Sequence, residues 1–130
     1  MEVEVTDKPK KKILVVDDEP DIVTGISDRL AFEGYEVITA NDGQTALSIA
    51  REKNPDLIVL DIMLPKIDGF KVCRLLKFDK KKKHIPIIML TAKTQETDIK
   101  TGKDMKADEY ICKPFDQDEL IKSIKKHLKE

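Results

Sequence analysis

The chain has 130 residues, and its 24 lysines and arginines nearly balance its 25 aspartates and glutamates, so a net charge of −1 gives no electrostatic reason to expect nucleic acid or an acidic membrane as a partner. Its 40% hydrophobic and 38% charged residues fit one globular domain, and no apolar run approaches the roughly 20 residues of a membrane span. The start lacks the apolar stretch of a secretory signal, and the two cysteines have neither metal-site spacing nor the density of a disulfide scaffold, so we expect a cytoplasmic protein with reduced thiols.

The first third of the chain begins with a polar segment and continues as strand, helix and strand. Residues 1–11 carry no periodicity and are expected to form an arm ahead of a single domain over residues 12–130. The apolar, β-branched run KILVVDD predicts a strand buried on both faces. Pro20 suits the first turn of the helix that follows, and Gly34 stands where a left-handed C-cap belongs. YEVITA then predicts the second strand.

The middle of the chain repeats this alternation. A helix is predicted from Gln44 to Lys53, followed by the third strand, LIVLD, and the turn LPKIDG. A third helix is predicted from about Phe70 to Phe78, with apolar residues at helical spacing. The lysine run from Lys80 to Lys83 is expected to be a solvated loop before the fourth strand, IPIIML.

The last part of the chain supplies the remaining elements. A weaker helical pattern covers about Thr97 to Met105, and DEYIC predicts the fifth strand. Asp116, with Glu119 three residues later, has the spacing of a capping box at the start of the last helix. Five strands thus alternate with five helices, which predicts an α/β fold with a five-stranded parallel sheet, doubly wound as (βα)5 by right-handed crossovers.

Polar side chains collect where the predicted strands end. Asp17 and Asp18 end the first strand, Asp61 ends the third, and Thr91 and Lys113 follow the fourth and fifth. The carboxyl ends of parallel strands meet at one edge of an open sheet, where ligands bind. Each residue alone has an ordinary explanation, such as a helix cap or a loop start. Their joint position at one edge favours a functional site.

Asp61 is the least expected of these residues, because it follows the apolar run LIVL. A partly desolvated carboxylate costs free energy unless it is paired, hydrogen-bonded or bound to a metal. Three neighbouring carboxylates also repel one another, which raises their pKa values and favours a bound cation. Oxygen ligands of this kind suit Mg²⁺, and Lys113 would add a second positive charge. The sequence therefore predicts a magnesium site.

With VDDEP, LDIMLPKIDG, LTA and DEYICKPF in this order, the sequence closely resembles the receiver domain of two-component response regulators, the chemotaxis receivers among them. The resemblance covers about Lys12 to Lys129 and implies the flavodoxin-like receiver fold. It also implies a phosphorylation-activated signalling switch, which accepts a phosphoryl group from a sensor histidine kinase or phosphotransfer protein. Such a domain catalyses only its own phosphorylation and dephosphorylation and is not an enzyme acting on other substrates.

The resemblance assigns roles to individual residues. Asp61 is implied to be the phosphoryl acceptor, a carboxylate nucleophile. Asp17 and Asp18 are implied to hold Mg²⁺ together with Asp61 and the backbone carbonyl of Met63. Lys113 is implied to contact the oxygens of the incoming phosphoryl group.

A conformational switch is implied as well. Thr91 would hydrogen-bond the phosphoryl group and draw its loop inward, and Tyr110 would turn from an outward to an inward position in the space that Thr91 leaves. The Lys113–Pro114 peptide bond is expected to be cis.

Two departures from the usual family pattern stand out. Lys106 occupies a position before the fifth strand where family members commonly carry glycine. Met63 and Lys93 occupy the positions that often govern attack of water on the acyl phosphate, and neither carries a carboxylate or amide that could orient a water molecule. Slow self-dephosphorylation is therefore expected.

Three other functions are weighed against this one. A Mg²⁺-dependent phosphatase of the haloacid dehalogenase type would need a second aspartate where Met63 stands. A nucleotide-binding flavodoxin-like domain would need a glycine-rich phosphate loop, which follows none of the predicted strands. An interaction module that works without phosphorylation would not need the intact acidic cluster with Thr91 and Lys113.

The output of the switch stays open. A stand-alone receiver that acts on a protein partner is favoured over a receiver domain from a longer DNA-binding or enzymatic regulator, although LDIMLP and Lys93 are also common in the latter. The domain itself is not expected to bind nucleic acid or membrane directly. The charge pattern does not decide whether it forms a homodimer.

Overall fold

Five strands and four helices make up the part of the chain that the computed structural model describes, residues 10–92 and 107–130. The strands are β1 (Lys12–Val16), β2 (Glu36–Ala40), β3 (Leu57–Asp61), β4 (Ile87–Ala92) and β5 (Glu109–Lys113). The helices are α1 (Pro20–Phe32), α2 (Gly43–Lys53), α3 (Gly69–Lys77) and α5 (Gln117–His127). These elements confirm the predicted alternation. The helix predicted over 97–105, with Lys93, Lys106 and the arm up to residue 9, lies outside the described residues.

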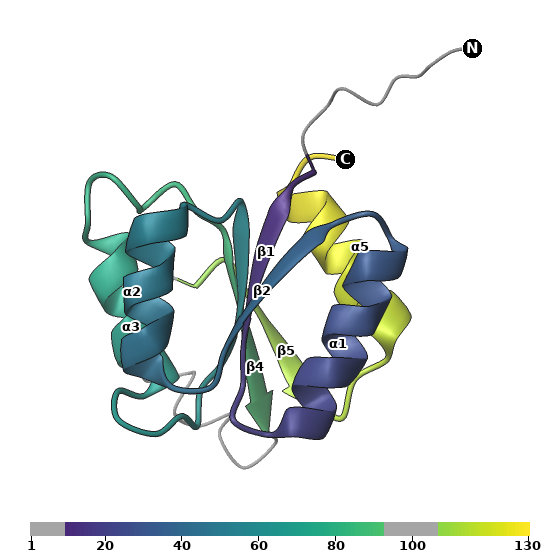
Figure 1. The fold of residues 1–130 in the computed structure, drawn as a ribbon, viewed down its shortest axis with the longest axis horizontal. Coiled ribbons are helices and arrows are strands. Elements are labelled where there is room, and N and C mark those ends of the chain that lie inside the picture. The colour runs from purple at the N-terminus through teal and green to yellow at the C-terminus, as the bar shows by residue number, and fades with distance from the viewer. Residues whose placement is uncertain (1–9, 93–106) are drawn as a thin grey trace.

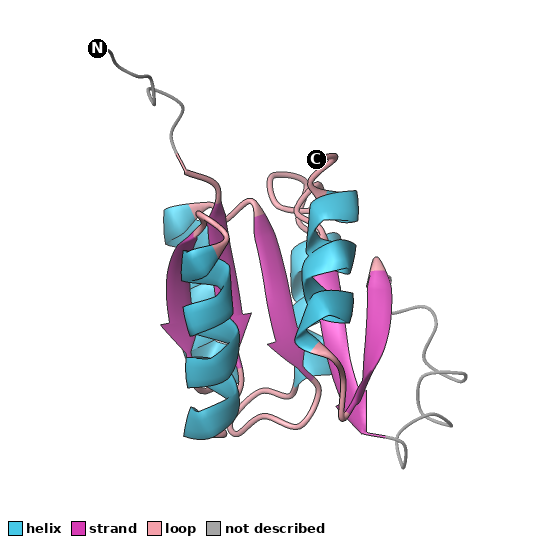
Figure 2. Ribbon diagram, turned by 90° about the vertical axis from the view of Figure 1, so that its right-hand side faces the viewer, coloured by secondary structure: helices cyan, strands magenta, loops and turns pink. Residues whose placement is uncertain are grey.

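All strands are parallel and form one sheet in the order β2-β1-β3-β4-β5. In Figure 1, α2 and α3 cover one face of the sheet, and α1 and α5 cover the other. Figure 2 looks onto the second of these faces, with the two helices running in front of the strands. The predicted doubly wound α/β fold is thereby confirmed, and the carboxyl ends of all strands lie along one edge.

A core on each side of the sheet explains why the strand sequences are continuously apolar. Leu14 and Val16 pack toward α2 and α3, whereas Ile13 and Val15 pack toward α1 and α5. All four side chains are fully buried. Alternate residues of a strand point to opposite faces, so a central strand covered by helices on both sides needs apolar residues throughout. Full burial of one such side chain contributes about 1.5–3 kcal/mol, which makes β1 a main source of stability.

The helix ends follow the predicted signals. Pro20 is in the first turn of α1, and Gly34 beyond its end has a positive φ of 96°. Asp116 caps α5, and Asp42 and Asp68, which were not predicted as caps, begin α2 and α3 in the same way. The carboxylate of Asp116 accepts a hydrogen bond from the backbone N–H of Asp118, one residue earlier than the predicted capping box requires. None of the described helices is long and apolar enough to cross a bilayer.

The prediction of a wholly solvated lysine loop is wrong for Lys82. Its side chain is buried, and its ammonium donates hydrogen bonds to the carbonyl of Arg51, at 3.1 Å, and to the side-chain oxygen of Asn54. Both acceptors lie at the C-terminal end of α2, where carbonyls lack partners within the helix and the helix dipole favours a cation. The neighbouring Lys80, Lys81 and Lys83 are exposed.

Gly69 is required by a close approach of the chain to the end of β3. A Cβ atom added there would lie 2.2 Å from the carbonyl oxygen of Asp61. We expect Gly69→Ala to destabilise the fold by ~1–3 kcal/mol, because backbone atoms have to move to relieve the overlap. Chemical denaturation measures the loss. The matched control is Gly25→Ala inside α1, where the added Cβ meets only the amide of Gln117 at 3.5 Å. Alanine favours the helix there by about 0.5–1 kcal/mol, so equal effects of the two substitutions would contradict this account.

Candidate functional site

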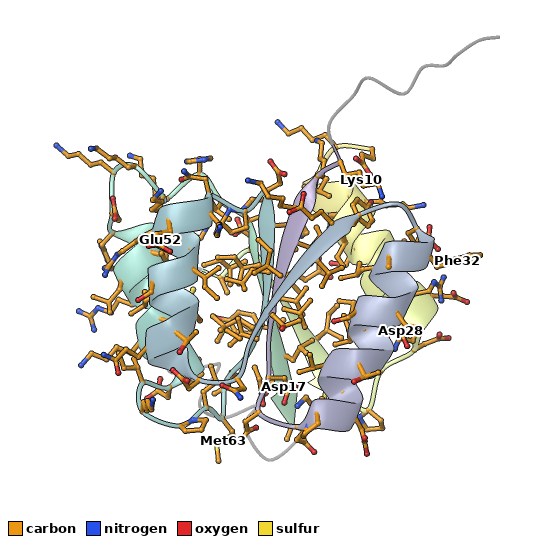
Figure 3. All side chains as sticks on the ribbon, viewed as in Figure 1. Lys10, Asp17, Asp28, Phe32, Glu52 and Met63 are labelled. Carbon is orange, nitrogen blue, oxygen red and sulfur yellow. The ribbon has the colours of Figure 1, made fainter. Side chains whose placement is uncertain are left out.

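The carboxyl edge of the sheet brings together four of the residues predicted to form a site. Asp17 follows β1, and Asp61 is the last residue of β3. Thr91 is the next-to-last residue of β4, and Lys113 is the last residue of β5. All four strands are neighbours in the sheet, so their ends meet. Figure 3 shows Asp17 and Met63 at this edge and Lys10 at the opposite one.

Lys113 is the centre of the charged group. Its ammonium lies 3.0 Å from Oδ2 of Asp17, 3.4 Å from Oδ2 of Asp61 and 3.4 Å from Oε1 of Glu19. The side chain of Asp17 is completely buried and that of Asp61 is 6% exposed, while Lys113 keeps 18% of its side chain exposed. One cation is thus shared by two buried carboxylates and a third on the surface. The peptide bond from Lys113 to Pro114 is cis, as predicted.

The pKa values of Asp61 and Lys113 follow from this arrangement. Burial, and then the charge of Asp17, raise the pKa of Asp61 to about 6, against the opposing effects of Lys113 and of the Met63 N–H. Burial by itself would lower the pKa of Lys113, but its hydrogen bond to Asp17 and the charge of Asp61 outweigh burial, so the pKa is raised. The site therefore keeps its ammonium charged, and its negative charges are only partly compensated.

Carboxylate oxygens of Asp17, Glu19 and Asp61 all lie within 4.8 Å of one another, the spacing at which they could hold one metal ion. Such oxygen donors suit a hard divalent cation, and the incompletely compensated charge favours one. Asp18, which was predicted as a ligand, is exposed and is not part of this group. It lines a cleft of about 360 Å³ together with Asp17.

Glu19 was not predicted to belong to the site. The signal was present in the sequence, since Glu19 directly follows the two aspartates and precedes Pro20. Its backbone N–H donates to Oδ1 of Asp17 at 3.0 Å, which fixes the turn from β1 into α1. Sequence spacing cannot tell which of two adjacent carboxylates turns toward Lys113, because that depends on this turn.

Met63 and the two residues of the predicted switch occupy different surroundings. The backbone N–H of Met63 faces Oδ1 of Asp61 at 3.4 Å, while its side chain is 67% exposed. Thr91 is buried, and its hydroxyl donates to the carbonyl of Ala92 at 3.1 Å. The ring of Tyr110 packs against the core beneath α2 and α3, and its buried hydroxyl has no hydrogen-bond partner among the described residues. Tyr110 therefore already lies inward, and the predicted outward starting position is wrong for this structure. The roles assigned to Thr91 and Met63 stay predictions.

Comparison with known proteins decides the family. The sequence matches the response regulator receiver domain over residues 13–125. The chain belongs to this family. The α/β fold with its acidic edge is therefore that of a response regulator receiver domain. The resemblance seen in the sequence motifs is confirmed.

Relatives of this receiver domain include a transcriptional regulator. The chain is 50% identical over 119 residues to the alkaline phosphatase synthesis transcriptional regulatory protein PhoP of Bacillus subtilis. The match covers 92% of the chain but 49% of PhoP. The receiver domain thus spans about half the length of this relative.

Solved structures agree with the fold of this receiver domain. The chemotaxis response regulator CheY4 of Vibrio cholerae superposes with a TM-score of 0.84 at 34% identity, covering 92% of this chain and 99% of that one. The receiver domain of the sensor histidine kinase PA1611 of Pseudomonas aeruginosa gives a TM-score of 0.85 at 30% identity, covering 94% and 100%. The PA1611 structure has a magnesium ion coordinated in its active-site cleft.

Asp61→Asn is expected to stabilise the metal-free receiver domain at pH 7. With its pKa near 6 in the folded state, Asp61 holds a proton between about pH 4 and pH 6 that the unfolded chain, with an ordinary pKa of 3.8, has released. At pH 7 Asp61 is ionised in both states, and its buried charge then destabilises the fold. Stability contributed by Asp61 therefore falls as the pH rises from about 4 to 6 and stays low above that window. A shift of this size corresponds to about 1–3 kcal/mol, which asparagine would recover at pH 7 and not at pH 4.

Urea denaturation in the presence of a chelator, at pH 4 and pH 7, measures this difference in the free energy of unfolding. Asp28→Asn on the exposed side of α1 is the matched control, since it removes a carboxylate that lies away from the site. A wild type more stable than Asp61→Asn at pH 7 would contradict the assigned pKa shift.

Proposed function

We propose that the chain is a phosphorylation-activated switch in which Asp61 accepts a phosphoryl group from a phosphohistidine of a sensor kinase or phosphotransfer protein. The observation that supports this most strongly is the buried Asp61 carboxylate, whose Oδ2 lies 3.4 Å from the ammonium of Lys113. A carboxylate held in this way is a nucleophile with a positive charge already in position for the phosphoryl oxygens.

In the proposed transfer, one Oδ of Asp61 forms a bond to phosphorus as the phosphorus–nitrogen bond to the donor imidazole breaks. The imidazole nitrogen keeps the electron pair of that bond, and the product is an acyl phosphate on Asp61. Lys113 would stabilise the negative charge on the transferred oxygens, since phosphoryl transfer depends mainly on positioning and charge neutralisation. Asp17 would keep Lys113 oriented through their 3.0 Å contact.

The residues at this edge fit a magnesium ion. Asp17 and Asp61 would hold it with their buried carboxylates, next to Glu19, and Asp18 and the carbonyl of Met63 stay the further ligands that the family resemblance implies. When bound, Mg²⁺ would neutralise charge on the phosphoryl oxygens. The fit rests on the donor set, because three carboxylates compensated by a single lysine leave negative charge that a divalent cation can balance.

The consequence of phosphorylation is proposed to be a change in surface. An acyl phosphate adds charge and three acceptor oxygens at the end of β3. Thr91 would turn toward these oxygens, and Tyr110, which already lies inward, would shift into the space that Thr91 leaves. The β4–β5 side of the domain would then present a different face to a partner. The domain would act on no substrate other than itself. The predicted slow self-dephosphorylation belongs to the same proposal.

The output is proposed to be control of transcription through a longer protein. PhoP of Bacillus subtilis is a transcriptional regulatory protein about twice as long as the match, and this supports the second of the two predictions made from the sequence. The stand-alone receiver, favoured from the sequence, draws support from the likeness to the chemotaxis regulator CheY4.

Incubation with acetyl phosphate and Mg²⁺ is expected to add one phosphoryl group to the wild type, measured as the intact mass of the protein. The gain should disappear when Mg²⁺ is chelated and in Asp61→Asn, because the first removes the charge balance and the second the nucleophile. Asp28→Asn is the matched control and should gain the group as the wild type does. Phosphorylation of Asp61→Asn, or none of the wild type with its fold intact, would contradict the proposal.

A further inference from the structure

Among the described residues, Glu19 is a charged side chain of the site to which neither the sequence motifs nor the proposed transfer assigns a role. It lies at the N-cap of α1 with an extended backbone, and its side chain makes no capping hydrogen bond. The next residue, Pro20, has no N–H to offer at the first helical position. The carboxylate of Glu19 is therefore not used by the helix and turns to Lys113.

The backbone holds Glu19 firmly while its side chain stays accessible. The N–H of Glu19 donates to Oδ1 of Asp17, and its carbonyl accepts the first bonds of α1, from the N–H groups of Ile22 and Val23. The carboxylate is 62% exposed, in contrast to the buried Asp17 and Asp61. Glu19 thus forms the solvent-exposed side of the charged group.

Lys113 cannot serve all its partners once a phosphoryl group is present. Its three donor hydrogens face the carboxylates of Asp17, Glu19 and Asp61 in this structure. Asp17 is buried and holds Lys113 at the shortest of the three distances, so that contact is the costliest to break. The contact with Glu19 is solvent-exposed and longer, and contacts of this kind contribute little net stability. A phosphoryl oxygen would displace Glu19 first.

We propose that Glu19 competes with the phosphoryl group for the ammonium of Lys113 and thereby limits both the rate and the strength with which the site takes up phosphoryl anions. This inference rests on the proposed function and concerns the regulation of the same site. Glu19 acts through Lys113 and is a positioning residue. Its carboxylate also repels the anionic donor directly, because both carry negative charge at the mouth of the site.

Glu19→Gln keeps the size of the side chain and removes its charge. It therefore tests competition for the Lys113 ammonium without changing how the side chain packs. Its affinity for trifluoroberyllate, an anionic phosphoryl mimic, is measured by fluorine NMR at saturating Mg²⁺. We expect binding about two- to fivefold tighter than in the wild type, the effect of releasing one exposed ion pair and one like charge. The rate of phosphorylation by acetyl phosphate should rise by a similar factor.

The matched control is Glu52→Gln, which removes one exposed carboxylate from α2, away from the site. It should bind the mimic as the wild type does. Unchanged or weaker binding by Glu19→Gln would overturn the proposal, and so would an equal gain in Glu52→Gln, which would point to net charge alone. If the wild type takes up neither the mimic nor a phosphoryl group, the proposed function itself fails. If the wild type and Glu19→Gln bind the mimic with equal affinity, only the role inferred for Glu19 fails.

Discussion

The shared ammonium of Lys113 is the interaction on which the arrangement of the acidic edge depends. Two carboxylates, Asp17 and Asp61, are almost completely removed from water at the ends of β1 and β3. Burial of a charged group is costly unless a partner compensates it, and one ammonium cannot compensate two carboxylates in full. The edge is therefore held in a state that a further cation would relieve. This local imbalance links the stability of the domain to the metal binding and the phosphoryl transfer proposed for it.

The packing of the sheet offsets the unfavourable charge imbalance at this edge. Residues of β1 and β3 are packed on both faces by helices, and their side chains alternate between two apolar cores. The strands end together because they are parallel neighbours, and the close approach of Gly69 to the Asp61 carbonyl fixes the chain just beyond β3. Stability gained throughout the sheet thus supports an edge that is unfavourable by itself, as is common where a protein carries out its chemistry.

Much of this organisation could be predicted from the sequence. The apolar strand runs, the helical periodicity and the order of polar strand ends were sufficient for the α/β fold and for Asp17, Asp61 and Lys113 as one group. Contacts that depend on local three-dimensional geometry could not be predicted in this way. Lys82 appeared to be one of four equivalent lysines until the end of α2 was seen to offer it acceptors, and Glu19 was indistinguishable from Asp18 until the turn after β1 was defined.

The pKa of Asp61 tests this account most directly. It can be followed in the metal-free protein by carbon NMR of the side-chain carboxyl group as the pH is varied. The account predicts a pKa of about 6, because burial and the charge of Asp17 outweigh the attraction of Lys113. A value near the ordinary 3.8 of an aspartate would mean that Lys113 fully compensates the site. The negative charge that is argued to favour a metal at this edge would then be absent.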